Sequence, residues 1–478
     1  MKRAVWCCLT LIAVTMTSLP PVASQTLDLN LPDIGDPSRQ YLSGSDEQRL
    51  GSAVLQQLRD QGAIVDDVQL SEYLAAVGQR IAAYADYTGH SYTFFMVDDL
   101  TINAFAAPGG YIGVNAGLLL ATRDEDELAG VLAHEIAHVS QRHIARRFAD
   151  TQRLNLPMAA ALLASALLAT ADPAAGRAAL TGTLAAGIQR QINFTRSNEQ
   201  EADRIGGQLL TRAGYDPTAL GDFFTRLERG AGSAQIPVFL RTHPLPSNRA
   251  ADAQNRFGNR GRERRNDLNY QMAKARAEVL TTDNTLNLIH RYQRQLSGDD
   301  PALRYGYALA LKQAGRYDEA SDQIDTLRRR YPDNLALRVE QADLALAGGE
   351  RDQAWRLFEQ AEQLYGDDYT LAMHYGQALA TQGDPRKAMA LLQPHLQRRT
   401  DTAPLYTLYA QAAQRAGNIG AAHAALTEYY ALTGDLDLAI EQAELGLSKT
   451  DVTPYQQAQL RARLRELQDR KARDEQRR

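Results

Sequence analysis

Cysteine is almost absent from this chain. Its two cysteines, Cys7 and Cys8, both lie in the apolar run over residues 4–19. A basic start before that run and small residues at 22–24 are typical of a secretory signal peptide, so we expect residues 1–24 to be removed. The mature protein would then contain no cysteine. It could form no disulfide, and it would have to bind any metal ion through histidine and carboxylate side chains.

Long hydrophobic runs are also scarce. The N-terminal run is short for a membrane span, which favours a cleaved signal over an uncleaved anchor. Residues 158–170 and 174–188 are rich in alanine and leucine, but each stretch is again too short to span. The segment 156–190 is predicted to form a buried helical hairpin. The alternative is a mobile lid, or an element that makes peripheral contact with a membrane.

The chain has no excess of positive charge. It carries 52 Lys and Arg against 57 Asp and Glu, a net charge of −5, which disfavours nucleic acid as a partner. Apolar residues make up an ordinary 44% of its 478 residues. This length is enough for two or three domains, each with a core of its own.

A short histidine motif carries the clearest chemical signal. His134-Glu135-Ile136-Ala137-His138 follows a predicted helix start, with Asp124 as N-cap and Glu127 at the capping-box position. On a helix, residues i and i+4 share one face, so both imidazoles can bind one metal ion. Glu135 is then placed to act on a metal-bound water as general base. The competing interpretation is a surface helix with two ordinary histidines.

A second acidic motif, Glu199-Gln200-Glu201-Ala202-Asp203, offers the missing ligand. Ser197 is predicted to cap this helix. Glu199 and Glu201 lie about 200° apart around it, so only one is expected to face the metal. Glu201 falls on a stripe of polar residues and is interpreted as solvated. We therefore expect Glu199 to be the third ligand, and Asp203, one turn on, to accept the free ring N–H of a ligating histidine.

The C-terminal half is repetitive. Small residues recur every 34 positions, which is the tetratricopeptide period, and further helices are expected near 268–280 and 284–297. The repeating positions are Gly315, Gly349, Gly383 and Gly417, followed by Ala320, Ala354, Ala388 and Ala422. Such arrays present a concave face to partners. By similarity to other repeats of this type, its groove positions include Tyr305, Leu309, Val339, Asp343, Met373, Gln377, Thr407 and Gln411. The competing interpretation is that some of these are packing residues.

These motifs together resemble a known family. H-E-x-x-H followed by E-x-x-A-D is similar to the gluzincin superfamily of the CAAX prenyl endopeptidase and HtpX. The likeness extends to Asn103–Ile112 and to Thr242–Ser247 with Arg249. With the repeats added, the chain resembles the periplasmic β-barrel assembly-enhancing proteases. The fold expected is mainly α: a gluzincin-like α+β metallopeptidase domain with a small sheet over 25–265, then a tetratricopeptide α-solenoid over 266–478.

The resemblance implies a function and the residues that perform it. One zinc ion per chain would be bound by His134, His138 and Glu199, in the periplasm of a Gram-negative bacterium. His243 is implied as a further, resting-state ligand, or else His243 or Arg249 as an oxyanion donor. An edge strand would bind protein substrates, through Asn103, Ala104, Phe105 and Ala106.

The same resemblance implies the partners. The repeat domain would engage outer-membrane β-barrel proteins and their assembly machinery, combining a chaperone-like role with degradation of misassembled chains. Two other classes of function compete with this one. The first is a non-proteolytic repeat scaffold or chaperone for envelope proteins. The second is a component of a zinc-dependent peptide transporter, which would need membrane spans that the sequence does not contain.

Overall fold

The structure is a computed structural model that describes residues 43–86, 91–143, 196–230, 237–243, 249–258, 263–296 and 299–476. The predicted signal peptide and the segment 156–190 lie outside the described residues. Within them the chain is mainly helical and has one small sheet, which confirms the expected fold class. No helix in this described part combines the length and the apolarity needed to cross a membrane.

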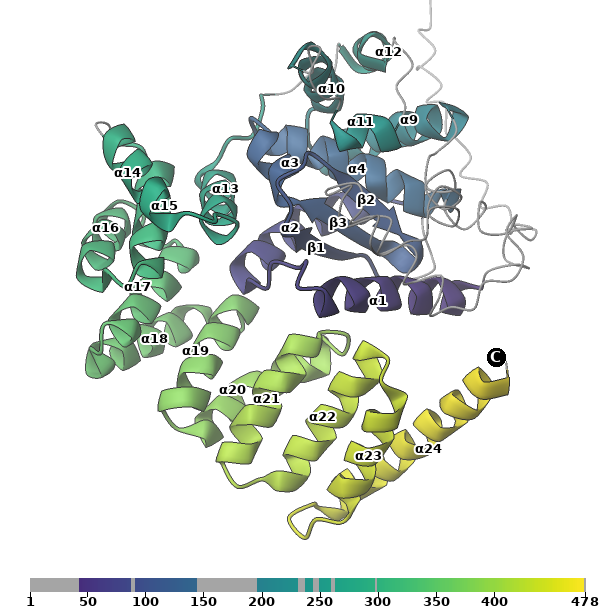
Figure 1. Cartoon of the computed structure of the whole chain (residues 1–478), viewed down its shortest axis with the longest axis vertical. Coiled ribbons are helices and arrows are strands. Elements are labelled where there is room, and N and C mark those ends of the chain that lie inside the picture. The colour runs from purple at the N-terminus through teal and green to yellow at the C-terminus, as the bar shows by residue number, and fades with distance from the viewer. Residues whose placement is uncertain are drawn as a thin grey trace, which may run out of the picture.

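A three-stranded sheet lies at the centre of the first domain (Figure 1). Its order is β1-β3-β2; β1 runs parallel to β3, and β2 runs antiparallel to β3. Strands β2 and β3 are joined by a turn at Gly109 and Gly110, whose φ values of 77° and 86° favour glycine. The elements so far are α1 (Gly44–Asp60), α2 (Val68–Ala82), β1 (Thr93–Val97), β2 (Ala104–Ala107), the 3-10 turn η2 (Pro108–Gly110) and β3 (Tyr111–Asn115).

Helix α4 is the buried axis of this domain. It begins after Asp124, whose carboxylate accepts a hydrogen bond from the Glu127 backbone N–H at 2.9 Å, as the capping motif predicts. Helix α9 packs along it, and Gly206 permits the close approach, because a Cβ there would lie 3.2 Å from the Ala133 carbonyl. The helices of this part are α3 (Ala116–Ala121), α4 (Glu125–Ser140), α9 (Arg196–Ala213), α10 (Ala219–Gly230), α11 (Val238–Thr242) and α12 (Arg249–Phe257).

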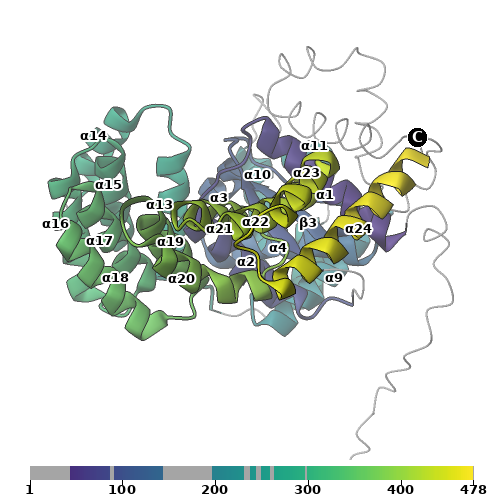
Figure 2. The same cartoon turned by 90° about the horizontal axis from the view of Figure 1, so that it is seen from below.

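Helix pairs of tetratricopeptide length follow, and they curve around the first domain (Figures 1 and 2). Gly315, Gly349 and Gly417 follow the first helix of their pairs and have φ values of 74°, 88° and 76°. These left-handed conformations favour glycine, which explains why glycine recurs at these positions. The helices are α13 (Leu268–Leu280), α14 (Thr285–Gln295), α15 (Pro301–Gln313), α16 (Tyr317–Arg330), α17 (Leu335–Ala347), α18 (Arg351–Tyr365), α19 (Tyr369–Gln382), α20 (Pro385–Arg398), α21 (Ala403–Arg415), α22 (Ile419–Thr433), α23 (Leu436–Leu447) and α24 (Pro454–Gln476).

Helix α13 belongs to two hydrophobic cores. Tyr270, Ala273 and Ala277 pack into the core of the first domain, whereas Met272 and Val279 pack into that of the first repeats. The hydroxyl of Tyr270 also forms a 3.0 Å hydrogen bond with Thr122 at the end of α3. The division at 265/266 stays a prediction, and a chain cut there would lose part of the first core.

The concave face of the early repeats is filled by the first domain. Tyr305, Leu309, Val339 and Met373, which were expected to line a partner groove, are all buried. Val68 at the start of α2 packs against the cluster that contains Val339 and Met373. These four positions are therefore packing residues, and of the expected set Gln377 and Gln411 remain exposed.

A buried arginine joins the two parts. Arg276 on α13 forms two 2.7 Å hydrogen bonds to Asp67, the N-cap of α2. The same guanidinium reaches the Tyr305 hydroxyl at 2.8 Å and Glu340 on α17 at 3.5 Å. Burial alone would lower the pKa of Arg276, but the surrounding Tyr305, Asp67 and Glu340 raise it well above its usual value.

Arg276→Met should destabilise the protein strongly, because Asp67 would remain buried without its partner. Such a loss costs about 3–5 kcal/mol, so the thermal midpoint should fall by at least about 5 °C. Arg399→Met is the matched control, since Arg399 pairs with Glu72 through side chains 36% and 28% exposed. That pair should contribute about 0–1 kcal/mol. Equal shifts of the two midpoints, measured by differential scanning fluorimetry, would contradict the argument.

Candidate metal centre

Four side chains from three segments meet in the interior of the first domain. His134 and His138 lie one turn apart on α4, Glu199 is in the first turn of α9, and His243 directly follows α11. All four are buried, with at most 2% of any of them exposed. Each offers one donor atom, and these atoms lie within 4.8 Å of one another.

The spacing of these donors fits a tetrahedral ion. Bonds of about 2.0–2.1 Å from a tetrahedral zinc place its ligands about 3.3 Å apart. The Nε2 of His134 lies 3.0 Å from Nε2 of His138, 3.3 Å from Nδ1 of His243 and 3.3 Å from Oε2 of Glu199. The Oε1 of Glu199 lies 3.5 Å from His138 Nε2 and 3.1 Å from His243 Nδ1. A metal ion therefore fits between the four side chains without rearrangement.

Glu135 stands beside this cluster. Its carboxylate is fully buried, and neither oxygen has a hydrogen-bond partner within the described parts of the chain. The Nε2 of His243 lies 3.6 Å away, beyond hydrogen-bond distance, and the backbone N–H of Ala106 on β2 approaches it. An unsatisfied buried carboxylate costs free energy, so this arrangement suits a group that acquires its partner on loading with metal and water.

The electrostatics match a cation site. Burial, together with the neighbouring His134, holds the pKa of His138 well below its usual value, so this imidazole is neutral and can donate a lone pair. Burial alone would raise the pKa of Glu199, but His243 and His134 outweigh that effect and hold it well below the usual range. Burial raises the pKa of Glu135 despite the opposing His243 and His134. The centre thus presents the neutral imidazole of His138 next to the ionised carboxylate of Glu199.

Both histidines of α4 have their second ring nitrogen engaged. The Nδ1 of His134 lies 3.0 Å from Oδ1 of Asp203, the partner that the sequence predicts. The Nδ1 of His138 lies 2.9 Å from Nδ1 of His143, a residue that the sequence analysis missed. The available signal was a third histidine within ten residues of a chain that has nine in all.

Two details of the α9 prediction are wrong. Glu201 is 37% exposed but is not simply solvated, because its Oε2 lies 3.1 Å from Nε2 of His143. Ser197 is not an N-cap, because α9 already includes Arg196. Helix position alone could not reveal the contact of Glu201, since its partner lies beyond the end of α4.

Aromatic rings from α10 and α11 pack against one side of the donor cluster. Phe239 stacks on the ring of His243 at 4.6 Å, and its carbonyl accepts the His243 backbone N–H at 2.9 Å. Phe224 stacks on Phe239 at 5.6 Å and meets the edge of His134 at 6.5 Å. These contacts hold His243 against the cluster and keep the surroundings apolar.

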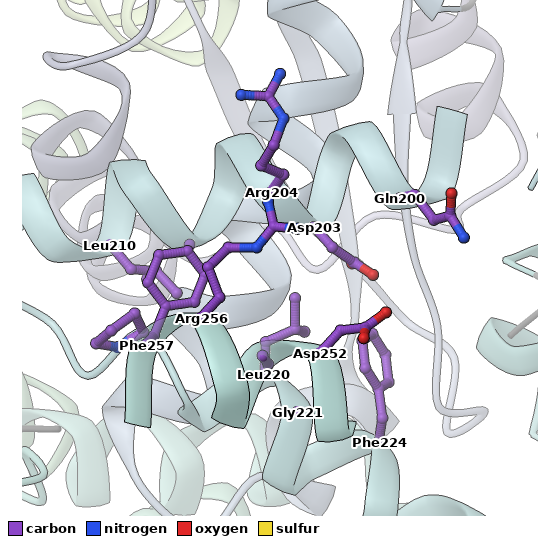
Figure 3. A pocket seen from close by; sticks show the side chains of 13 residues that line it. Gln200, Asp203, Arg204, Leu210, Leu220, Gly221, Phe224, Asp252, Arg256 and Phe257 are labelled. Atoms are coloured by element: carbon purple, nitrogen blue, oxygen red, sulfur yellow. The ribbon is translucent and has the colours of Figure 1, made fainter. Parts of the chain in front are cut away.

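A pocket opens between α9, α10 and α12 (Figure 3). Asp203 and Phe224 line it, together with Arg204, Asp252 and Arg256. Asp203 therefore contacts the metal centre on one side and the pocket on the other. The pocket does not contain Glu135 or the donor atoms of the cluster, so it is separate from the place where chemistry is expected.

The remaining predicted residues divide into two groups. Asn103, Ala104, Phe105 and Ala106 lie at or just before β2, which is one of the two edge strands of the described sheet and packs against α4. Asn103 and Phe105 are themselves buried, so a substrate would meet the strand backbone. Arg249 begins α12, and its side chain lies outside what the structure describes.

Comparison with known proteins decides the family. The pattern of Peptidase family M48 matches residues 69–257. The chain is 35% identical, over 96% of its own length and 96% of the other's, to the β-barrel assembly-enhancing protease of Escherichia coli O157:H7. The chain belongs to peptidase family M48. A putative β-barrel assembly-enhancing protease of Vibrio cholerae is 34% identical over 95% of this chain and 96% of its own.

More distant relatives match a shorter part of the chain. The mitochondrial metalloendopeptidase OMA1 of Schizosaccharomyces pombe is 33% identical over 37% of this chain and 50% of its own. Membership of family M48 and the His/Glu cluster make this chain a metal-dependent peptidase. The M48 match runs from residue 69 to residue 257. It therefore covers the sheet, α4 and α9, and it ends before the repeats.

The two glutamates of α9 should differ sharply in their effect on metal affinity. Glu199→Ala removes a donor from the cluster, whereas Glu201→Ala removes a contact to His143. We expect Glu201→Ala to lose at most about 100-fold in zinc affinity and Glu199→Ala to lose far more. Competition with a chromophoric chelator measures both, and Arg204→Ala on the same helix is the control. A greater loss in Glu201→Ala would overturn the assignment.

Proposed function

We propose that the chain is a zinc metalloendopeptidase with one zinc ion, bound by His134, His138 and Glu199. The observation that carries this proposal is the buried set of donors at tetrahedral spacing beside the unpartnered carboxylate of Glu135. Imidazole and carboxylate suit zinc, and the mature sequence leaves no thiolate to compete. Two histidines one turn apart and a glutamate from a second helix also leave a fourth position for water.

The proposed mechanism assigns one task to each residue. Zinc, when bound, lowers the pKa of a coordinated water towards about 7 and polarises the substrate carbonyl. Glu135 accepts the proton of that water and passes it to the leaving amine. Asp203 holds the His134 ring in position through its 3.0 Å contact. The β2 backbone binds the substrate chain by strand addition, with Asn103–Ala106 next to Glu135.

His243 is proposed as a fourth ligand of the resting enzyme. Its Nδ1 lies 3.1 Å from Glu199 and 3.3 Å from His134, which is the place that the attacking water would need. The enzyme is then latent until the segment that carries His243 moves. In the open state His243 or Arg249 can serve as the oxyanion donor.

The proposed cellular role combines proteolysis with assistance to assembly. Two relatives that match nearly the whole chain are named for enhancing β-barrel assembly. We propose that this protein acts in the periplasm of a Gram-negative bacterium, aids outer-membrane β-barrel proteins and degrades misassembled ones, with the repeats contacting them and their assembly machinery. A non-proteolytic scaffold is the alternative, and the intact motif of His134, Glu135 and His138 argues against it.

Glu135→Gln should abolish peptide cleavage while zinc stays bound, because Glu135 moves protons and does not ligate. General base catalysis typically contributes a factor of about 10²–10⁴ to the rate. Casein digestion with and without chelator, beside zinc analysis of the same samples, measures both effects. Cleavage by this variant at the wild-type rate would rule out the mechanism, and a chelator-insensitive wild type would rule out the metal.

His243→Ala should raise basal proteolysis, including self-cleavage, because the fourth position would be open to water. Digestion of casein by the purified variant, with Glu135→Gln introduced in the same chain as control, measures the effect. A variant that retains zinc but cleaves every substrate more slowly would instead identify His243 as an oxyanion donor. That result would exclude the latent state.

A further inference from the structure

His143 occupies an unusual place beside the metal centre. It lies three residues beyond the end of α4 and is completely buried. The chain reaches this place through Arg142, which has a φ of 52°, the left-handed region that an arginine rarely adopts. The Nε of Arg142 donates to the buried Glu47 of α1 at 3.1 Å. The strained turn is therefore anchored, and it returns His143 towards His138.

The hydrogen-bond chain from His138 has only one consistent direction once a metal is bound. The Nε2 of His138 belongs to the donor cluster, so the ring proton must reside on Nδ1. That N–H donates to Nδ1 of His143 over 2.9 Å, which therefore carries no proton. The Nε2 of His143 then carries its proton and donates it to Glu201 over 3.1 Å. The carboxylate of Glu201, at the end of this series of hydrogen bonds, accepts that hydrogen bond.

We propose that His143 and Glu201 are positioning residues that fix the tautomer and orientation of His138 for metal binding. This inference rests on the proposed zinc site. It parallels the contact of Asp203 with His134, except that here a neutral imidazole lies between the ligand and the carboxylate. Partners that accept the second N–H of a metal-bound histidine raise its basicity, and losing them typically costs about 10–100-fold in affinity.

Helix geometry explains why an intermediate residue is needed. Glu199 and Asp203 are four residues apart and share the face of α9 that looks onto α4. Glu201 is rotated by about 200° from Glu199 and lies on another face. Its carboxylate therefore contacts His143, beyond the end of α4, and acts on His138 only through that ring. Arg204, in the next turn, lies 4.0 Å from Glu201 at its closest oxygen.

The test compares three variants of the full-length chain for zinc affinity, measured by chelator competition. His143→Leu keeps the bulk but removes the acceptor, and it should lose about 10–100-fold. His143→Asn places an oxygen near the position of Nδ1 and should restore affinity close to the wild-type value. Glu201→Ala should lose less than His143→Leu, and Arg204→Ala, the control, should lose nothing. The visible spectrum of the cobalt-loaded protein should change in His143→Leu and stay unchanged in His143→Asn.

The outcomes separate the inference from the proposed site. If the wild type binds zinc and His143→Leu binds it equally well, the positioning role is wrong. If His143→Leu and His143→Asn lost equal zinc affinity, the effect would be due to packing, and the positioning role would again be wrong. A wild type that binds no zinc would refute the metal site itself. If His143→Leu fails to fold, Glu201→Ala decides the matter, because its partly exposed side chain can be removed without opening the core.

Discussion

Helices α4 and α9 touch backbone to backbone where Gly206 faces Ala133 and His134, and the distances in the metal centre depend on that contact. Helix α4 supplies His134, Glu135 and His138, whereas α9 supplies Glu199 and Asp203. With any larger residue at 206 the helices would separate by several tenths of an ångström. The distances from Glu199 to the two histidines of α4, now 3.3 and 3.5 Å, would then lengthen beyond the spacing of about 3.3 Å expected between the ligands of a tetrahedral zinc ion.

Burial makes this arrangement costly for the metal-free chain and selective for a cation. Several ionisable groups lie in an apolar shell that includes Phe224 and Phe239, away from water that could satisfy them. Among the residues that the structure describes, none forms a hydrogen bond with the Glu135 carboxylate, and the pKa values of His138 and Glu199 are displaced in the directions that favour ligation. Such displaced values are typical of functional sites, because packing for stability alone would not assemble them.

The sequence was sufficient where chemistry is local. Helical spacing predicts the pairing of His134 with His138, and the face of α9 separates Glu199 from Glu201. Prediction from the sequence failed where residues meet through a turn of the chain that the sequence pattern does not indicate. His143 reaches His138 only through the left-handed Arg142, and no periodicity encodes that turn. The groove positions of the early repeats likewise follow the repeat pattern, yet Val68 of α2 packs against the cluster that contains Val339 and Met373. A repeat pattern does not contain that tertiary contact.

The double membership of α13 has a consequence for the order of folding. Tyr270 packs into the core around α3, but it is synthesised after every residue of the H-E-x-x-H motif. The peptidase core is therefore incomplete until the chain has emerged to about residue 280, by which point the first repeat helix is present. A truncated or stalled polypeptide would lack the α13 side chains that pack into this core. The core around the metal centre is thus complete only once the segment that begins the helical repeats has been synthesised.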